Sequence, residues 1–104
     1  SLDEVWTFFP DPWRKARHHK RRLVSTEFAD LVALKLRPGG LWRLATDWED
    51  YAFWQRETLD AHPRLENLHD DWAPRYEARP VTKYEAKGLA QGRRVYDLTY
   101  RRLP

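Results

Sequence analysis

The chain has 104 residues, the size of one small domain, of which 41% are hydrophobic, 34% are charged and none is cysteine. The lack of cysteine excludes disulfides, thiolate catalysis and cysteine-ligated zinc or iron–sulfur clusters, and it fits a cytoplasmic protein. The net charge is +3 at pH 7, and because no apolar run reaches eighteen residues, the sequence predicts no membrane span.

A strand and a stiff loop are predicted first. Residues 4–9 are rich in β-branched and aromatic side chains and end at Pro10, which predicts a strand buried on both faces. Pro10 and Pro12 disfavour helix at the positions before them. Asp11 is therefore predicted to lie in an extended loop at the carboxyl end of this strand.

A helix, a strand and a second helix are predicted next. Residues 25–36 begin with two hydroxyl side chains, either of which can cap a helix with one apolar face, and the Pro-Gly-Gly sequence at 38–40 ends this helix. Residues 41–45 predict a second strand. Residues 46–47 are then expected to cap a helix that continues to about His62.

The second half of the chain has a weaker pattern. It predicts a brief strand over 65–68, a polar loop over 70–80, a helix over 82–92 that opens with a capping box, and a last strand over 95–100. The order strand, helix, strand, helix predicts a right-handed crossover and two parallel strands. Since an α/β sheet usually has more strands, the predicted fold class is α/β, as part of a larger domain.

The basic excess of the chain lies in one segment. Residues 1–13 carry a charge of −3, residues 14–22 carry +6, and residues 23–104 are neutral overall. Six cations without an acid repel one another, so a polyanion contact is favoured over a solvated loop or a localisation signal. His18 and His19 lie in this segment, but adjacent histidines rarely converge on one ion, so we expect no metal.

Two aspartates follow the two predicted parallel strands. Asp11 follows the first strand and Asp47 the second, and open α/β sheets place their ligand crevice at these carboxyl ends. Both carboxylates are therefore expected to face one crevice, where Trp13 offers a surface on which a base can stack. The alternatives are a rigid turn around Asp11 and an ordinary acidic first helical turn at Asp47.

A third candidate site is the segment over residues 82–85. A capping box accounts for Thr82 and Glu85. In this motif the Thr82 hydroxyl caps the start of the helix, and the Glu85 carboxylate bonds back to the backbone N–H of Thr82. It does not account for Lys83. The segment is therefore either a helix start or part of a binding site.

Four motifs occur in order along the chain: Phe9-Pro10-Asp11-Pro12-Trp13, Lys15-x-Arg17-His18-x-Lys20-Arg21-Arg22, Ala45-Thr46-Asp47-Trp48-Glu49-x-Tyr51 and Arg79-Pro80-x-Thr82-Lys83-Tyr84-Glu85-x-x-Gly88. With these four motifs taken together, the chain resembles the bacterial tRNA (guanine-N7-)-methyltransferases over residues 4–102. It departs from the family pattern at Arg14, where many members have proline or histidine, and at Tyr84, where phenylalanine is common.

The resemblance implies a fold, a cofactor and a reaction. The fold is the carboxyl-terminal half of a Rossmann-like class I methyltransferase sheet with flanking helices, so residues 1–104 are expected to be part of a single domain. Family members carry the Gly-rich turn that holds S-adenosylmethionine in an amino-terminal half, to which nothing here corresponds. The implied reaction is methyl transfer from S-adenosylmethionine to N7 of guanosine 46 in tRNA, and we expect this fragment alone to be inactive.

The resemblance also implies residue roles and partners. Asp11 matches the catalytic and cofactor-proximal aspartate, and Lys15 and Asp47 match substrate contacts. A substrate-binding tetrad matches Thr82, Lys83, Tyr84 and Glu85. The tRNA-binding segment matches Arg17, His18, His19, Lys20, Arg21 and Arg22. The expected partner is tRNA, without a metal or a membrane, and an open sheet edge predicts self-association. A non-enzymatic basic RNA-binding or interaction module is the competing function.

Overall fold

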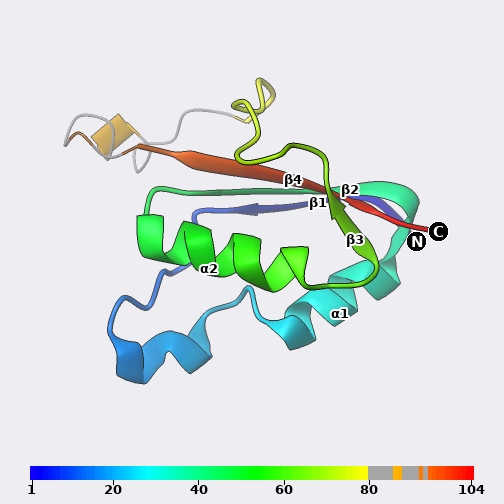
Figure 1. Cartoon of the computed structure of the whole chain (residues 1–104). Helices are drawn as coiled ribbons and strands as arrows, with labels where there is room; N and C mark the ends of the chain where they lie inside the picture. The colour runs from blue at the N-terminus through cyan, green and yellow to red at the C-terminus, as the bar shows by residue number, and fades with distance from the viewer. Residues whose placement is uncertain (80–85, 88–91, 93) are drawn as a thin grey trace.

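Among the described residues, four strands form one mixed sheet with the order β1-β2-β4-β3 in the computed structural model (Figure 1). The structure describes residues 1–79, 86–87, 92 and 94–104. Its elements are β1 (Leu2–Phe8), the 3₁₀-helix η1 (Ala16–Arg21), α1 (Thr26–Lys35), β2 (Leu36–Thr46), α2 (Glu49–Asp60), β3 (Leu65–Asn67) and β4 (Tyr96–Arg102). β1 and β2 are parallel, whereas β4 is antiparallel to β2 and β3. The predicted α/β class and the parallel first pair of strands are confirmed.

Both α-helices cover the same face of the sheet (Figure 1), and the core lies between them and the strands. α1 begins after Ser25, whose hydroxyl accepts a hydrogen bond from Phe28 N at 3.2 Å. Trp42 of β2 is fully buried, and its Nε1 donates to Thr7 Oγ1 at 2.9 Å. The core also contains Val24, Ala29, Val32, Ala33, Leu36, Leu44, Tyr51, Leu59, Leu65, Leu98 and Tyr100. This packing holds the carboxyl ends of β1 and β2 next to each other.

β1 is more exposed than the sequence predicts. The predicted burial on both faces is wrong, because only Thr7 of this strand is buried and Trp6 is 51% exposed. Val5 packs against the core, whereas Trp6 lies against Tyr76 with 5.6 Å between their ring centroids. Burial on both faces requires a packed layer on both sides of the sheet, and the described helices supply a layer on one side.

The Pro-Gly-Gly sequence lies inside a strand rather than after a helix. α1 ends at Lys35 and β2 starts at once with Leu36, five residues earlier than predicted. The pairing with β1 shifts register across residues 37–40, as in a bulge. At Gly40 an added Cβ would lie 3.0 Å from Asp3 O, so a glycine allows the two strands to approach. The signal that predicts a helix stop therefore marks an irregularity in the sheet.

α2 begins later than predicted, because its N-cap residue is Trp48 and not Thr46 or Asp47. Thr46 Oγ1 instead accepts a hydrogen bond from Trp48 N at 3.3 Å, which forms a turn before the helix. The last predicted strand is confirmed as β4. The helix predicted over 82–92 lies mostly outside the described residues. Within the described ranges, every helix is too short or too polar to cross a membrane.

Candidate functional site

The Asp11 loop leaves the carboxyl end of β1 beside β2. Phe9 N donates to Ala45 O at 2.8 Å, which continues the parallel ladder one residue past β1. Phe9 and Trp13 have φ values of 54° and 41°, a conformation that side chains other than glycine rarely adopt. Asp11 is exposed, and its Oδ1 accepts a hydrogen bond from Trp13 N at 3.0 Å. The loop is thus a rigid turn under backbone strain, a combination that is common at functional sites.

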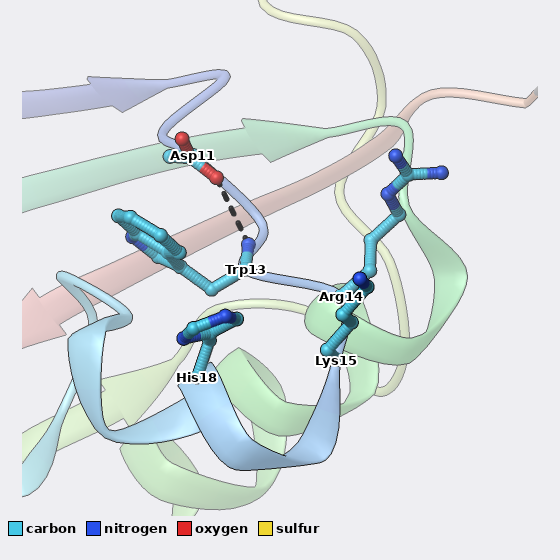
Figure 2. A pocket seen from close by; sticks show the side chains of 5 residues that line it. All are labelled: Asp11, Trp13, Arg14, Lys15 and His18. Atoms are coloured by element: carbon cyan, nitrogen blue, oxygen red, sulfur yellow. Dashed lines mark hydrogen bonds between the residues drawn. The ribbon is translucent and has the colours of Figure 1, made fainter.

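An open pocket of about 460 Å³ lies between this loop and η1 (Figure 2). Its lining residues are Asp11, Trp13, Arg14, Lys15 and His18. The rings of Trp13 and His18 lie close together, with 5.6 Å between their centroids (Figure 2). The structure therefore brings Asp11, Lys15 and His18, three of the predicted site residues, to one pocket. A carboxylate, cations and two flat rings in one pocket suit an aromatic, polar ligand such as a nucleobase.

Most of the predicted RNA-binding segment forms η1 and faces solvent. Arg17, Lys20 and Arg21 are exposed, and His18 and His19 are half-buried. The Arg21 guanidinium lies 5.2 Å from the centre of the Trp13 ring, so a cation of this segment borders the pocket. These exposed cations are free of acidic neighbours on η1 itself. A polyanion can therefore reach them and the pocket from the same side.

Arg22 differs from its neighbours because it is buried, at 3% exposure. Its Nη2 lies 2.5 Å from Asp50 Oδ2 of α2, and its Nε donates to Pro12 O at 2.7 Å. Its guanidinium also lies 4.9 Å from the centre of the Tyr51 ring. The prediction that Arg22 contacts RNA is not tested, but the position of its side chain in the interior argues for a different task.

Asp47 lies at the same end of the sheet as Asp11, as predicted, but in a different environment. It follows β2 by one residue and is 5% exposed, whereas Asp11 is exposed. Asp47 is not among the described residues that line the pocket. The two carboxylates therefore follow neighbouring parallel strands without facing one pocket in the same way. The predicted substrate role of Asp47 remains a prediction.

The predicted tetrad Thr82, Lys83, Tyr84 and Glu85 lies outside the described residues. Arg79, which belongs to the same motif as the tetrad, is 2% exposed and pairs with Asp97 of β4 at 3.2 Å. Its guanidinium lies 5.4 Å from the centre of the Phe9 ring. Arg79 therefore lies beside the start of the Asp11 loop.

Comparison with known proteins assigns the family. A family described as putative methyltransferases matches residues 1–98. The chain belongs to this family. It is 59% identical over 106 residues to a tRNA (guanine-N(7)-)-methyltransferase of Cutibacterium acnes and 60% identical over 103 residues to one of Nocardioides. These matches cover 99% and 98% of this chain but 38% and 40% of the two relatives, so the chain spans about two fifths of their length. The resemblance predicted from the motifs is confirmed.

A solved structure supports the fold class of the family. The SAM-dependent O-methyltransferase from Thermotoga maritima aligns with a TM-score of 0.50 at 15% sequence identity, covering 99% of this chain and 34% of that protein. At this identity the likeness concerns the fold alone. The mixed sheet with flanking helices is therefore a Rossmann-like methyltransferase arrangement.

The residues present fit one side of a cofactor site in a methyltransferase. The exposed Asp11 carboxylate lies at the carboxyl end of a parallel strand, where open α/β sheets bind nucleotide-like ligands. Gly39 and Gly40 lie near the start of β2, at the other end of the sheet, so they do not form a cofactor-binding turn beside Asp11. Within residues 1–79, 86–87, 92 and 94–104, no group of three or more histidine or acidic side chains is placed to hold a metal ion.

Sequence reasoning missed two positions that shape this site. Asp50 holds the Arg22 guanidinium, and Arg79 pairs with Asp97 while its guanidinium lies against the Phe9 ring. The sequence shows Asp50 only as an acidic residue of a first helical turn, which needs no partner to explain it. Arg79 does lie in one of the recognised motifs, so the motif was a signal that this arginine matters.

Proposed function

We propose that the chain is part of an enzyme that transfers a methyl group from S-adenosylmethionine to N7 of a guanine in tRNA, at guanosine 46. The observation that carries this proposal is the pocket at the end of β1. There Asp11, Trp13 and Lys15 lie together beside an exposed basic helix, in a chain 50–60% identical to enzymes named for this reaction.

The chemistry asks for alignment and charge control. N7 of guanine carries a free lone pair and no proton, so the attack needs no general base. The bound cofactor supplies an electrophilic methyl group, whose bond to sulfur breaks as the bond to N7 forms. A purine cation then develops beside the transferred group. The Asp11 carboxylate stabilises that cation or holds the amino edge of the guanine. Both roles require a carboxylate that a bound guanine can reach, and Asp11 lines the open pocket.

The remaining predicted residues serve binding in this proposal. Trp13 offers a ring on which a base drawn from the tRNA loop stacks, and Lys15 lies on the same pocket. The exposed cations Arg17, Lys20 and Arg21 bind phosphates of the tRNA backbone. Asp47 and the tetrad at residues 82–85 complete the substrate site.

A chimaera tests the proposed reaction. In it, this chain replaces the matching 106-residue segment of the Cutibacterium acnes relative, which supplies the rest of a full-length protein. We expect the chimaera to methylate tRNA, and nucleoside mass spectrometry to find 7-methylguanosine that disappears when guanosine 46 is replaced by adenosine. The unaltered relative is the positive control. An active relative beside a chimaera without methyl transfer contradicts the proposal.

The chain alone provides a second test, which addresses the competing binding-module function. We expect it to bind tRNA through its exposed cations but neither to bind S-adenosylmethionine tightly nor to methylate tRNA. Calorimetry with the cofactor and a filter-binding assay with tRNA measure both. Micromolar affinity of the chain alone for the cofactor contradicts the expectation that most of the cofactor site lies outside these 104 residues.

A further inference from the structure

Arg22 is the buried member of the predicted tRNA-binding segment. Arg21 before it is exposed and Leu23 after it is 47% exposed, whereas Arg22 is 3% exposed. Its guanidinium lies within 5.1 Å of the ring centres of Tyr51 and Trp54, both on α2. An arginine that binds a phosphate must present its guanidinium to the outside. The side chain of Arg22 points instead to the interior.

The segment around Arg22 is held against α2 by hydrogen bonds at both backbone groups of Val24, its N–H and its carbonyl. Val24 N donates to the Tyr51 hydroxyl at 3.1 Å, and Trp54 Nε1 donates to Val24 O at 2.8 Å. Arg22 itself donates to Asp50 at the start of α2. The position of the guanidinium is therefore set by its contacts with one helix, α2.

Arg22 and Asp11 bind the two ends of one peptide group. The peptide between Pro12 and Trp13 accepts a hydrogen bond at its oxygen from Arg22 Nε at 2.7 Å. The N–H of the same peptide donates to Asp11 Oδ1 at 3.0 Å. Because a peptide group is planar, holding its oxygen also orients its N–H. A charged donor on the oxygen further polarises the group and strengthens its N–H as a donor.

We propose that Arg22 is a positioning residue that sets the orientation of the Asp11 carboxylate through the Pro12–Trp13 peptide, and that it does not bind tRNA. The inference rests on the proposed methyl transfer for its kinetic consequences. Trp13 has a φ of 41°, so the peptide that precedes it is held in a conformation that would relax without a partner. Arg22 supplies that partner from α2.

Positioning the Pro12–Trp13 peptide requires an arginine, because two nitrogens of one side chain must donate to two acceptors that lie in different directions. Nε reaches Pro12 O while Nη2 reaches Asp50 Oδ2, and the planar guanidinium packs against Tyr51. A lysine keeps the charge but offers a single nitrogen and no planar surface. Arg22→Lys is therefore expected to lose the positioning effect although the net charge is unchanged.

Kinetics of the chimaera separate positioning from tRNA binding. We expect Arg22→Lys to lower kcat by about 10- to 100-fold, as a displaced catalytic group does. We expect Arg22→Gln to leave the slope of log affinity for tRNA against log salt unchanged, whereas Arg21→Gln lowers its magnitude by about 0.7 to 0.9. Arg64→Lys, at an exposed arginine that does not line the pocket, is the matched control and keeps kcat. A kcat that survives Arg22→Lys, or a salt slope that falls in Arg22→Gln, overturns the inference.

A double-mutant cycle tests whether Arg22 acts through Asp11. In an Asp11→Ala background, single-turnover rates are expected to change less than twofold on adding Arg22→Lys, because the group that Arg22 orients is gone. A general loss of structure would lower the rate in both backgrounds. An undiminished effect in the Asp11→Ala background therefore overturns the inference.

Amide hydrogen exchange tests the contact without any activity. In the chain alone, we expect Arg22→Lys to accelerate exchange of the Trp13 N–H at least tenfold, while the N–H of Trp42 in the core strand β2 keeps its rate and reports intact folding. Unchanged exchange at Trp13 overturns the inference. If the unaltered chimaera fails to methylate tRNA, the proposed function fails, and this measurement still decides whether Arg22 holds the loop.

Discussion

Arg21 and Arg22 are neighbours of the same type in one basic run, yet the fold places them in opposite environments. Arg21 is exposed at the end of η1 and borders the pocket over Trp13. Arg22 is buried against α2 and holds the loop that carries Asp11. The segment thus has an outer side that faces solvent and an inner side that supports the pocket. A charge counted in the sequence is a possible ligand contact only if its side chain reaches solvent.

The loop that the inner side supports carries the largest expected effect, through Asp11. Asp11→Ala in the chimaera is expected to lower turnover by about 10²- to 10³-fold, because the group that stabilises the developing purine cation is removed. The affinity for tRNA is expected to stay within twofold. Asp70→Ala, at an exposed acidic position that does not line the pocket, is the control. Turnover close to that of the unaltered chimaera would remove Asp11 from the mechanism.

The outer side is tested by charge removal. Replacing Arg17, Lys20 and Arg21 by glutamine is expected to weaken tRNA binding by at least tenfold at moderate salt and to lower the magnitude of the salt slope by about 2 to 3. Replacing Lys35, Arg37 and Arg64, which are exposed elsewhere, makes the same change in net charge and is the matched control. Equal losses in the two triple variants would show that total charge matters and that η1 has no special role.

Stability distinguishes the two arginines directly. Arg22→Met is expected to lower the free energy of unfolding by about 1.5 to 3 kcal/mol, because it loses hydrogen bonds from a charged donor to Pro12 O and Asp50. Arg21→Met is expected to change it by less than about 0.5 kcal/mol, as exposed substitutions usually do. Urea unfolding of the chain measures both values. Equal values would contradict the division into an inner and an outer side.

The smallest expected effect concerns alkaline pH. Burial raises the pKa of the Tyr51 hydroxyl, which accepts from Val24 N beneath Arg22. Since the folded pKa lies above the unfolded one, stability is fully present below about pH 10 and is lost as pH rises further. Tyr51→Phe is expected to make that loss less steep by up to about 1.4 kcal/mol per pH unit. Urea unfolding between pH 9 and 12 tests this, and an unchanged slope would show that the pKa of Tyr51 is the same in the folded and unfolded states.

Self-association remains a prediction, and it rests on the free edge of β1. Within the described residues β1 pairs with β2 on one side, and Trp6 is 51% exposed beside this edge. Open strand edges are templates for pairing with another chain. Size-exclusion chromatography over a hundredfold range of concentration decides the question, because a monomer at every concentration contradicts the prediction.

Local patterns in the sequence were sufficient for much of the fold and part of the site. Alternating strand and helix signals predicted the parallel pair β1 and β2, and the prolines around Asp11 predicted the turn that follows β1. The Pro-Gly-Gly sequence misled, because the same residues serve a helix stop and a strand bulge. The local pattern could not tell which of the two the neighbouring strand required.

The sequence by itself determined which residue types follow which strand, where the positive charge gathers, and to which family the chain belongs. Only the tertiary structure decided that Arg22 turns inward while Arg21 stays outside, and that Asp47 is buried while Asp11 is open. The physical reason is that burial depends on partners far along the chain. Asp50, which binds Arg22, lies 28 residues away in the chain, and no local sequence pattern indicates that contact.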